Sequence, residues 1–181
     1  MNDSVMREFL SEDNMNLHFS HIKTMSHKYS IIKKSTEGLI ATSSAEVKRC
    51  KAPASLKNEA IILLSYIEAH KIYFDSFAHI SKKCNNVRKR FGSEERCLYE
   101  VLSLAKENEH CFVYVYLDSK GRATIAAALP QDIHTVLTPI LAIDLYEHSY
   151  FYDYGFNKDK YLQNAIGRLN LEKLDNALSC S

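Results

Sequence analysis

The segment AIDLYEHSYFYDY, residues 142–154, decides how the fold of this chain is interpreted. A short apolar run from Pro139 to Ile143 ends in an acidic residue, Asp144, and His148 follows four residues later among several tyrosines. Apolar runs of this length are typical of buried strands. An acid and an imidazole at the end of such a strand, surrounded by aromatic rings, indicate a buried polar site from which the rings exclude bulk water.

Two helical patterns precede this segment. The first begins after Ser11, a suitable N-cap, and the second begins near Ser55. Apolar residues recur in both at spacings of three and four, which gives each helix one apolar stripe. The first stripe consists of Met15, His18, Ile22, Met25, Tyr29 and Ile32, and the second of Leu63, Ile67, His70, Phe74 and Phe77. The breakers between the two patterns favour an antiparallel helical hairpin.

The second half of the chain has mixed helix and strand patterns. It predicts strands near residues 111–117, 122–128 and 138–144, with DSKG as the turn between the first two. The predicted fold is therefore α+β: an N-terminal antiparallel helical hairpin followed by an α/β layer with a small three-stranded antiparallel sheet. We expect two domains, an N-terminal helical hairpin domain over residues 1–85 and a C-terminal α/β domain over residues 86–181.

Each apolar stripe carries one histidine in its middle, His18 in the first and His70 in the second. A single histidine on an apolar face is more often a core residue hydrogen-bonded to the backbone. Two of them on facing helices, together with Asp144 and His148, are costly to bury unless they share partners or a metal ion. Three imidazoles and one carboxylate are suitable ligands for a mid-row transition metal.

Composition and charge exclude several classes of function. The net charge of +1 gives no argument for a nucleic-acid or membrane partner, and the basic runs KRCK and KKCNNVRKR lack interleaved aromatic residues. The polar N-terminal stretch predicts neither a signal peptide nor a membrane span. The 5 cysteines include no C-x-x-C pair, which favours free thiols in a reducing cytoplasm over a zinc–thiolate site.

Several segments resemble the manganese/iron superoxide dismutase family in the right order, from about residue 10 to residue 175. DLYEHSYFYDY resembles that family's Asp-x-Trp-Glu-His-Ala-Tyr-Tyr segment, whose Asp and His bind the metal. MNLHFS and AHKIYF are similar to the two helical stretches that hold the other ligands. RFGS, GRATIAAALPQD and KYLQNAIGRLNLE resemble a Phe-Gly-Ser, a strand and loop ending in Asn-Gln-Asp, and the closing helix.

This resemblance implies an oxidoreductase that converts superoxide to oxygen and hydrogen peroxide by redox cycling of bound manganese or iron. The implied metal ligands are His18, His70, Asp144 and His148. Gln131 falls on the glutamine that manganese-type enzymes supply beside the metal, whereas the iron-type position is occupied here by Tyr66. Manganese is therefore the expected metal, with iron as the alternative. Glu147 matches a glutamate that bridges to the other subunit, which implies a homodimer through the Glu147–His148 region.

The chain also departs from the family's pattern. It has no tryptophan, and Tyr146 and Phe74 occupy two positions where the family walls its site with tryptophan. Without a gap, the family's gateway histidine becomes Ile22, and a slip of one residue would make His21 the gateway instead. The family's second-sphere tyrosine becomes Ser26, and Tyr29, one turn further on, is the tyrosine expected to approach the site. These changes leave a second function open: a divergent metalloprotein with another redox or oxygen-dependent activity, or a structural component without dismutase activity.

Overall fold

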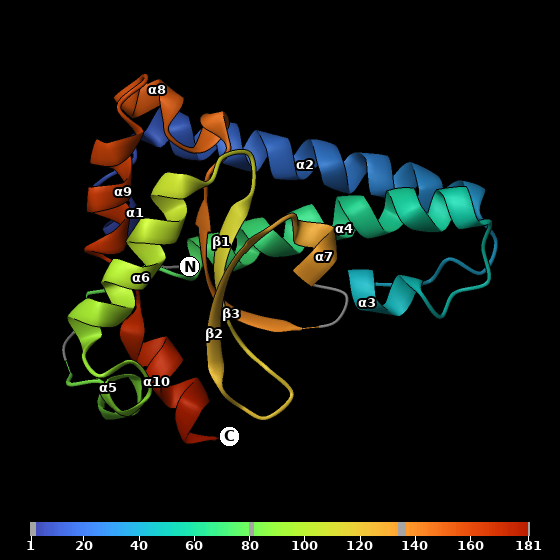
Figure 1. Ribbon diagram of the computed structural model, residues 1–181. Helices are drawn as coiled ribbons and strands as arrows, with labels where there is room; N and C mark the ends of the chain where they lie inside the picture. Colours follow the sequence, from blue (N-terminus) through green and yellow to red (C-terminus); the bar gives the residue numbers. More distant parts are fainter. Residues whose placement is uncertain (1–2, 80–81, 134–136, 181) are drawn as a thin grey trace.

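The N-terminal half forms a long helical hairpin (Figure 1). The computed structural model of the protein describes residues 3–79, 82–133 and 137–180. The elements of this half are α1 (Asp3–Met6), α2 (Glu12–Ser35), α3 (Ser44–Val47) and α4 (Ala54–Phe74). The predicted cap is present, because Ser11 Oγ accepts a hydrogen bond from the amide of Asn14 at 3.1 Å. In Figure 1, α4 runs back alongside α2, as the sequence predicts.

The apolar stripe of α2 faces α4. All its predicted members are buried except Ile22, which is half-buried. Its second half packs into a small core at the tip of the hairpin, formed by Met25, Tyr29, Ile32, Leu39, Ala41, Val47, Ala60, Leu64 and Ile67. His18, near the start of α2, lies instead at the end of the hairpin that meets the rest of the protein.

The C-terminal half holds the sheet. Its elements are α5 (Asn85–Phe91), α6 (Glu94–Glu107), β1 (Phe112–Leu117), β2 (Ala123–Ala128), α7 (Pro130–Ile133), β3 (Thr138–Asp144), the 3-10 helix η1 (Glu147–Ser149), α8 (Phe151–Tyr154), α9 (Lys158–Ile166) and α10 (Leu171–Ser179). The three strands are antiparallel in the order β2-β1-β3 and lie where the sequence predicts them. The predicted α+β fold is confirmed.

The turn between β1 and β2 is built on Asp118. Its Oδ1 accepts hydrogen bonds from the amides of Lys120 and Arg122, and its Oδ2 pairs with the Arg122 guanidinium at 2.8 Å. Gly121 has φ +71°, a conformation that favours glycine. The DSKG turn predicted from the sequence is therefore present.

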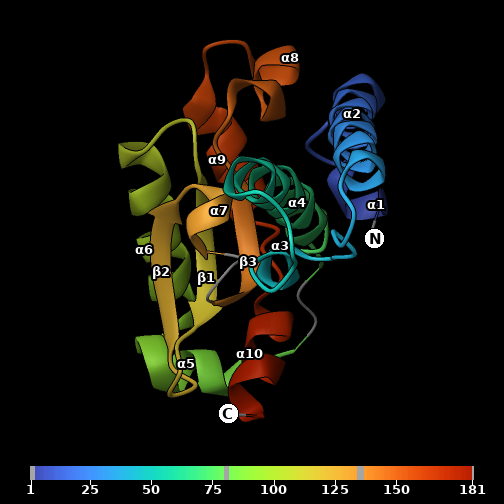
Figure 2. The same cartoon turned by 90° about the vertical axis from the view of Figure 1, so that its right-hand side faces the viewer.

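The layers are visible from the side in Figure 2, where α2, α4, the sheet and α6 follow one another. α4 packs against β3, and α6 packs against β1 and β2. One large core joins the two halves, since it extends from Val5 of α1 through Phe74 of α4 to Leu174 of α10. The predicted division between residues 85 and 86 stays a prediction. Residues 80 and 81, at the end of the predicted N-terminal domain, lie outside the described residues.

The cysteines are free thiols. Cys84, Cys97 and Cys111 are buried, and burial raises the pKa of Cys97 to about 12, so this thiol is unreactive at neutral pH. Across the part of the chain that the structure describes, no helix combines the length and the apolar character needed to cross a membrane.

Candidate metal centre

Four side chains from four elements converge on one point. His18 comes from α2, His70 from α4, Asp144 from the last position of β3, and His148 from η1. Each offers one possible ligand atom, and these atoms all lie within 4.8 Å of one another. The side chains of His18, His70 and Asp144 are fully buried, whereas that of His148 is 23% exposed. The group therefore has one side that reaches toward solvent.

The spacing of these atoms fits a shared metal ion. His148 Nε2 lies 3.3 Å from Asp144 Oδ2 and 3.2 Å from His70 Nε2, and His70 Nε2 lies 3.7 Å from Asp144 Oδ2. Among the described residues, both ring nitrogens of the buried His18 have no hydrogen-bond partner, and buried Asp144 Oδ2 has none beyond its approach to His148 Nε2. Unpartnered buried polar atoms are costly, and a cation between them would remove that cost.

Hydrogen bonds behind the group fix its orientation. The carbonyl of Tyr66 lies 2.7 Å from His70 Nδ1 and can only accept, so Nδ1 carries the proton and Nε2 keeps its lone pair for the centre. The amide of Tyr146 donates to Asp144 Oδ1 at 2.9 Å, which leaves Oδ2 to face the histidines. The backbone carbonyl of Asp144 accepts from Tyr161 Oη at 2.9 Å and from Ser149 Oγ at 3.0 Å.

The electrostatics give these side chains the protonation states that bind metals. Burial lowers the pKa of His18 to about 3, and burial also lowers the pKa of His70. For Asp144, burial alone would raise the pKa, but the three neighbouring histidines lower it overall. Asp144 in turn raises the pKa of His148 against the effect of burial. At neutral pH, His18 and His70 are therefore neutral imidazoles and Asp144 is a carboxylate.

Aromatic rings enclose the four-residue group on the side that faces the protein interior. The rings of Phe74 and Tyr73 each lie 5.5 Å from that of His18, centroid to centroid, and Phe112 lies 5.6 Å from His70. On the outer side, the exposed His21 stacks on His148 with centroids 5.1 Å apart. The structure thus brings His18, and not His21, into the four-residue group, while His21 lies over its outer side.

Comparison with known proteins agrees with this geometry. Residues 79–177 match the family model of the iron/manganese superoxide dismutases, C-terminal domain. The protein named superoxide dismutase [Fe] from Cupriavidus metallidurans is 30% identical over 147 residues, which cover 74% of this chain and 74% of that protein. The chain belongs to the iron/manganese superoxide dismutase family. Membership and the His/Asp donor set together support manganese or iron as the class of cofactor.

Of the two other predicted site residues, Gln131 lies on α7, which packs against α4, the helix that carries His70. Its side chain is half-buried, and it is outside the four-residue group. Tyr29 does not approach the centre. Its hydroxyl donates to the carbonyl of Ala41 at 2.6 Å within the small core at the hairpin tip. The expectation for Tyr29 is corrected, because three turns of α2 separate it from His18.

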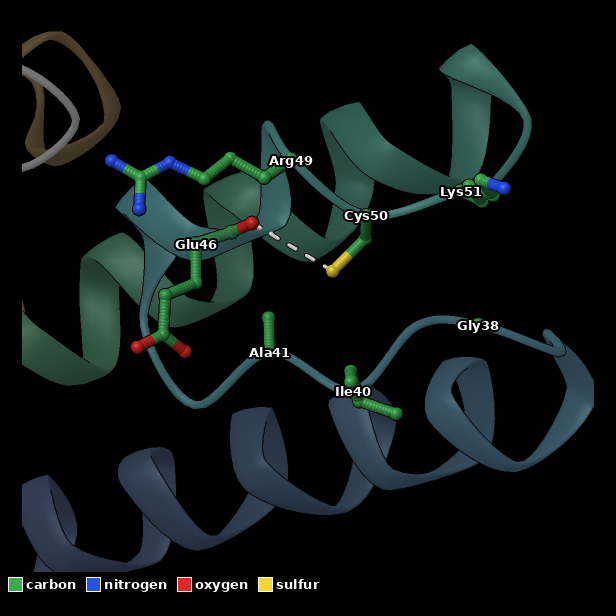
Figure 3. Close-up of a pocket in the computed structure, with 7 residues that line it drawn as sticks. All are labelled: Gly38, Ile40, Ala41, Glu46, Arg49, Cys50 and Lys51. Atoms are coloured by element: carbon green, nitrogen blue, oxygen red, sulfur yellow. Dashed lines mark hydrogen bonds between the residues drawn. The ribbon is translucent and has the colours of Figure 1, made fainter.

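The hairpin tip also contains a hollow of about 410 Å³ (Figure 3). It is lined by Gly38, Ile40, Ala41, Glu46, Arg49, Cys50 and Lys51. The Cys50 thiol points into it and lies 3.7 Å from the carbonyl of Glu46. This hollow is at the opposite end of the hairpin from the four-residue group. Its lining has one carboxylate and one thiol but no imidazole, so it lacks the metal-ligating side chains of that group.

Sequence reasoning did not identify the residues that hold His70 and Asp144 in place. The carbonyl of Tyr66 accepts from the ring of His70, and the hydroxyls of Tyr161 and Ser149 both donate to the backbone carbonyl of Asp144. One local signal was available: Tyr66 precedes His70 by four residues, the spacing at which a helical carbonyl lies below a side chain. The contact of Tyr161 with Asp144 spans 17 residues and has no local signal.

Proposed function

We propose that this protein is a superoxide dismutase, an enzyme that converts two superoxide anions and two protons to oxygen and hydrogen peroxide. The observation that carries the proposal is the convergence of three imidazoles and one carboxylate within 4.8 Å in a member of this family. We further propose His18, His70, Asp144 and His148 as the metal ligands. The unpartnered buried ring nitrogens of His18 support this assignment, since a bound cation would satisfy one of them.

Each part of the site contributes to that reaction in a definite way. A bound manganese or iron ion supplies one-electron redox chemistry between its divalent and trivalent states. The carboxylate of Asp144 offsets part of the ion's charge, and the neutral rings of His18 and His70 donate lone pairs from directions fixed by packing. The rings of Phe74, Tyr73 and Phe112 exclude bulk water. His148 and the exposed His21 border the outer side, where a small anion would enter.

Manganese is the metal that we propose, with iron as the second candidate. The proposal rests on Gln131, because manganese-type members of the family supply a glutamine from this part of the chain. Iron stays a candidate because the relative from Cupriavidus metallidurans bears iron in its name. We also propose a cytoplasmic location, which is supported by the free cysteines among the described residues.

Replacing Gln131 by Leu should lower turnover about tenfold while metal content is largely retained. The change removes the side-chain amide that the family resemblance places beside the metal but none of the four proposed ligands, and outer partners of this kind tune the bound solvent and the potential. Metal analysis and a superoxide-consumption assay on the same preparation measure both effects. Gln163→Leu is the matched control, since Gln163 is exposed on α9 and should leave both unchanged. Equal turnover in the two variants would contradict the role of Gln131.

We propose a homodimer formed around Glu147 and His148. Glu147 is exposed beside a proposed ligand, and the neighbouring aromatic side chains are also exposed, Phe151 by 46% and Tyr152 by 61%. Exposed aromatic side chains close together in the sequence are typical of an interaction surface. Sedimentation should give twice the chain mass of 20.7 kDa, and Glu147→Ala should weaken the dimer. Glu37→Ala, at the hairpin tip, should not. A wild-type monomer at micromolar concentration would contradict this proposal.

A superoxide-consumption assay on the metal-loaded protein tests the proposed activity. We expect consumption well above that of the same concentration of free manganese or iron, and its loss on metal removal. If the protein carries a full complement of metal but consumes superoxide no faster than free metal, dismutase activity is rejected. The second candidate, a family member with another redox activity or a structural role, would then be the better account.

A further inference from the structure

Two tyrosines form a hydroxyl bridge beside the proposed metal centre. The hydroxyl oxygens of Tyr66 and Tyr146 are 2.6 Å apart, and the ring centroids are 5.8 Å apart. Tyr66 lies on α4, one helical turn before His70. Tyr146 lies between β3 and η1, two residues after Asp144 and two before His148. The bridge therefore joins the helix that carries one candidate ligand to the segment that carries two others.

The backbone of each tyrosine holds one of those candidate ligands. The carbonyl of Tyr66 accepts from His70 Nδ1 at 2.7 Å, and the amide of Tyr146 donates to Asp144 Oδ1 at 2.9 Å. The side-chain bridge and these two backbone contacts form a continuous chain from His70 through Tyr66 and Tyr146 to Asp144. A shift of either tyrosine would turn the ring or the carboxylate that its backbone holds.

The surroundings strengthen this bridge. Phe112 lies 5.8 Å from the ring of Tyr146 and 5.6 Å from that of His70, so an apolar ring fills the space between them. The ring of Tyr146 also stacks on His148, with centroids 5.8 Å apart and an interplanar angle of 25°. A hydrogen bond in surroundings of low dielectric constant is stronger than the same bond in water.

We propose that the Tyr66–Tyr146 hydroxyl bridge is a positioning element that fixes His70 and Asp144 relative to each other before a metal ion binds. This inference rests on the metal centre of the proposed function but not on superoxide as the substrate. Packing alone would need only the rings, because phenylalanine fills nearly the same volume. The hydroxyls add the link between α4 and the Asp144–His148 segment, so they should affect how tightly and in what geometry the ion is held.

The test compares Tyr66→Phe, Tyr146→Phe and the double variant with the wild-type protein, each loaded with manganese. Metal affinity is measured by competition with a chelator, and ligand geometry by electron paramagnetic resonance of the bound divalent ion. We expect each single variant to bind metal about fivefold to tenfold more weakly and to change the resonance spectrum. The double variant should lose no more than either single variant, since both remove the same bond.

Tyr99→Phe is the matched control, because Tyr99 is 68% exposed on α6 and should leave affinity and spectrum unchanged. Circular dichroism and thermal melting of every variant separate this role from a general loss of stability. Unchanged affinity and spectrum in both single variants would overturn the proposal, as would losses that simply add in the double variant. A wild-type protein that binds metal but does not consume superoxide would reject the dismutase function alone. The affinities and spectra of the variants would still test the positioning role of the bridge.

Discussion

Replacing Asp144 by Asn should lower the metal content of the purified protein more than about tenfold. Loss of a partner behind a ligand already costs about tenfold to a hundredfold in affinity, and Asp144 is the one anionic side chain in the four-residue group. The amide of asparagine matches the carboxylate in shape, so its oxygen can still accept the hydrogen bond from the amide of Tyr146. A loss of metal therefore reports the loss of the negative charge and of Oδ2 as a metal ligand, rather than a collapse of the site.

Metal content per chain, measured by elemental analysis after growth with added manganese and iron, is the readout. Asp159→Asn is the matched control, since Asp159 is exposed on α9 and forms a surface ion pair with Lys106. This control should keep the wild-type metal content. If Asp144→Asn keeps a full complement of metal, the ion is held elsewhere and the four-residue centre is wrong.

Replacing Phe74 by Ala should reduce the free energy of unfolding by about 3–5 kcal/mol, the usual cost of removing a buried phenylalanine ring. Phe74 is fully buried at the end of α4, and its ring contacts those of Tyr73, Phe19 and His18. The cavity would lie against His18, so metal affinity should fall together with stability. Denaturant unfolding of the metal-free protein measures the first effect, and chelator competition measures the second.

Phe156→Ala provides the same change at a position that is 94% exposed. It should alter the free energy of unfolding by less than about 0.5 kcal/mol, since little apolar surface is buried there. Comparable losses in the two variants would contradict the view that Phe74 belongs to a packed wall around His18.

The elements of the fold could be predicted because their signals are local. The Ser11 cap, the stripe around His18 and the Asp118 turn each depend on residues within a few positions of one another. The sequence from β3 to His148 was sufficient to predict that Asp144 and His148 share a site with the two helical histidines. His18 and His70 were recognised as polar residues on apolar helical stripes, and Asp144 as an acid at the end of an apolar strand.

The supporting contacts could not be predicted, because they depend on how distant segments meet. Tyr66 and Tyr146 are 80 residues apart, and their hydroxyls form a bond only because α4 and the end of β3 pack side by side. Tyr29 was misplaced for a related reason. Its position on the stripe was right, but the stripe serves two cores, and the tip core holds its hydroxyl on Ala41.

Anomalous X-ray diffraction from crystals of the purified protein, recorded at the manganese and iron absorption edges, tests the central claim most directly. We expect one strong peak enclosed by His18, His70, Asp144 and His148, with metal–ligand distances of about 2.0–2.3 Å. The edge at which the peak appears identifies the metal. A protein that is active or metal-loaded but shows no peak among these four side chains, or shows it elsewhere, would contradict the account.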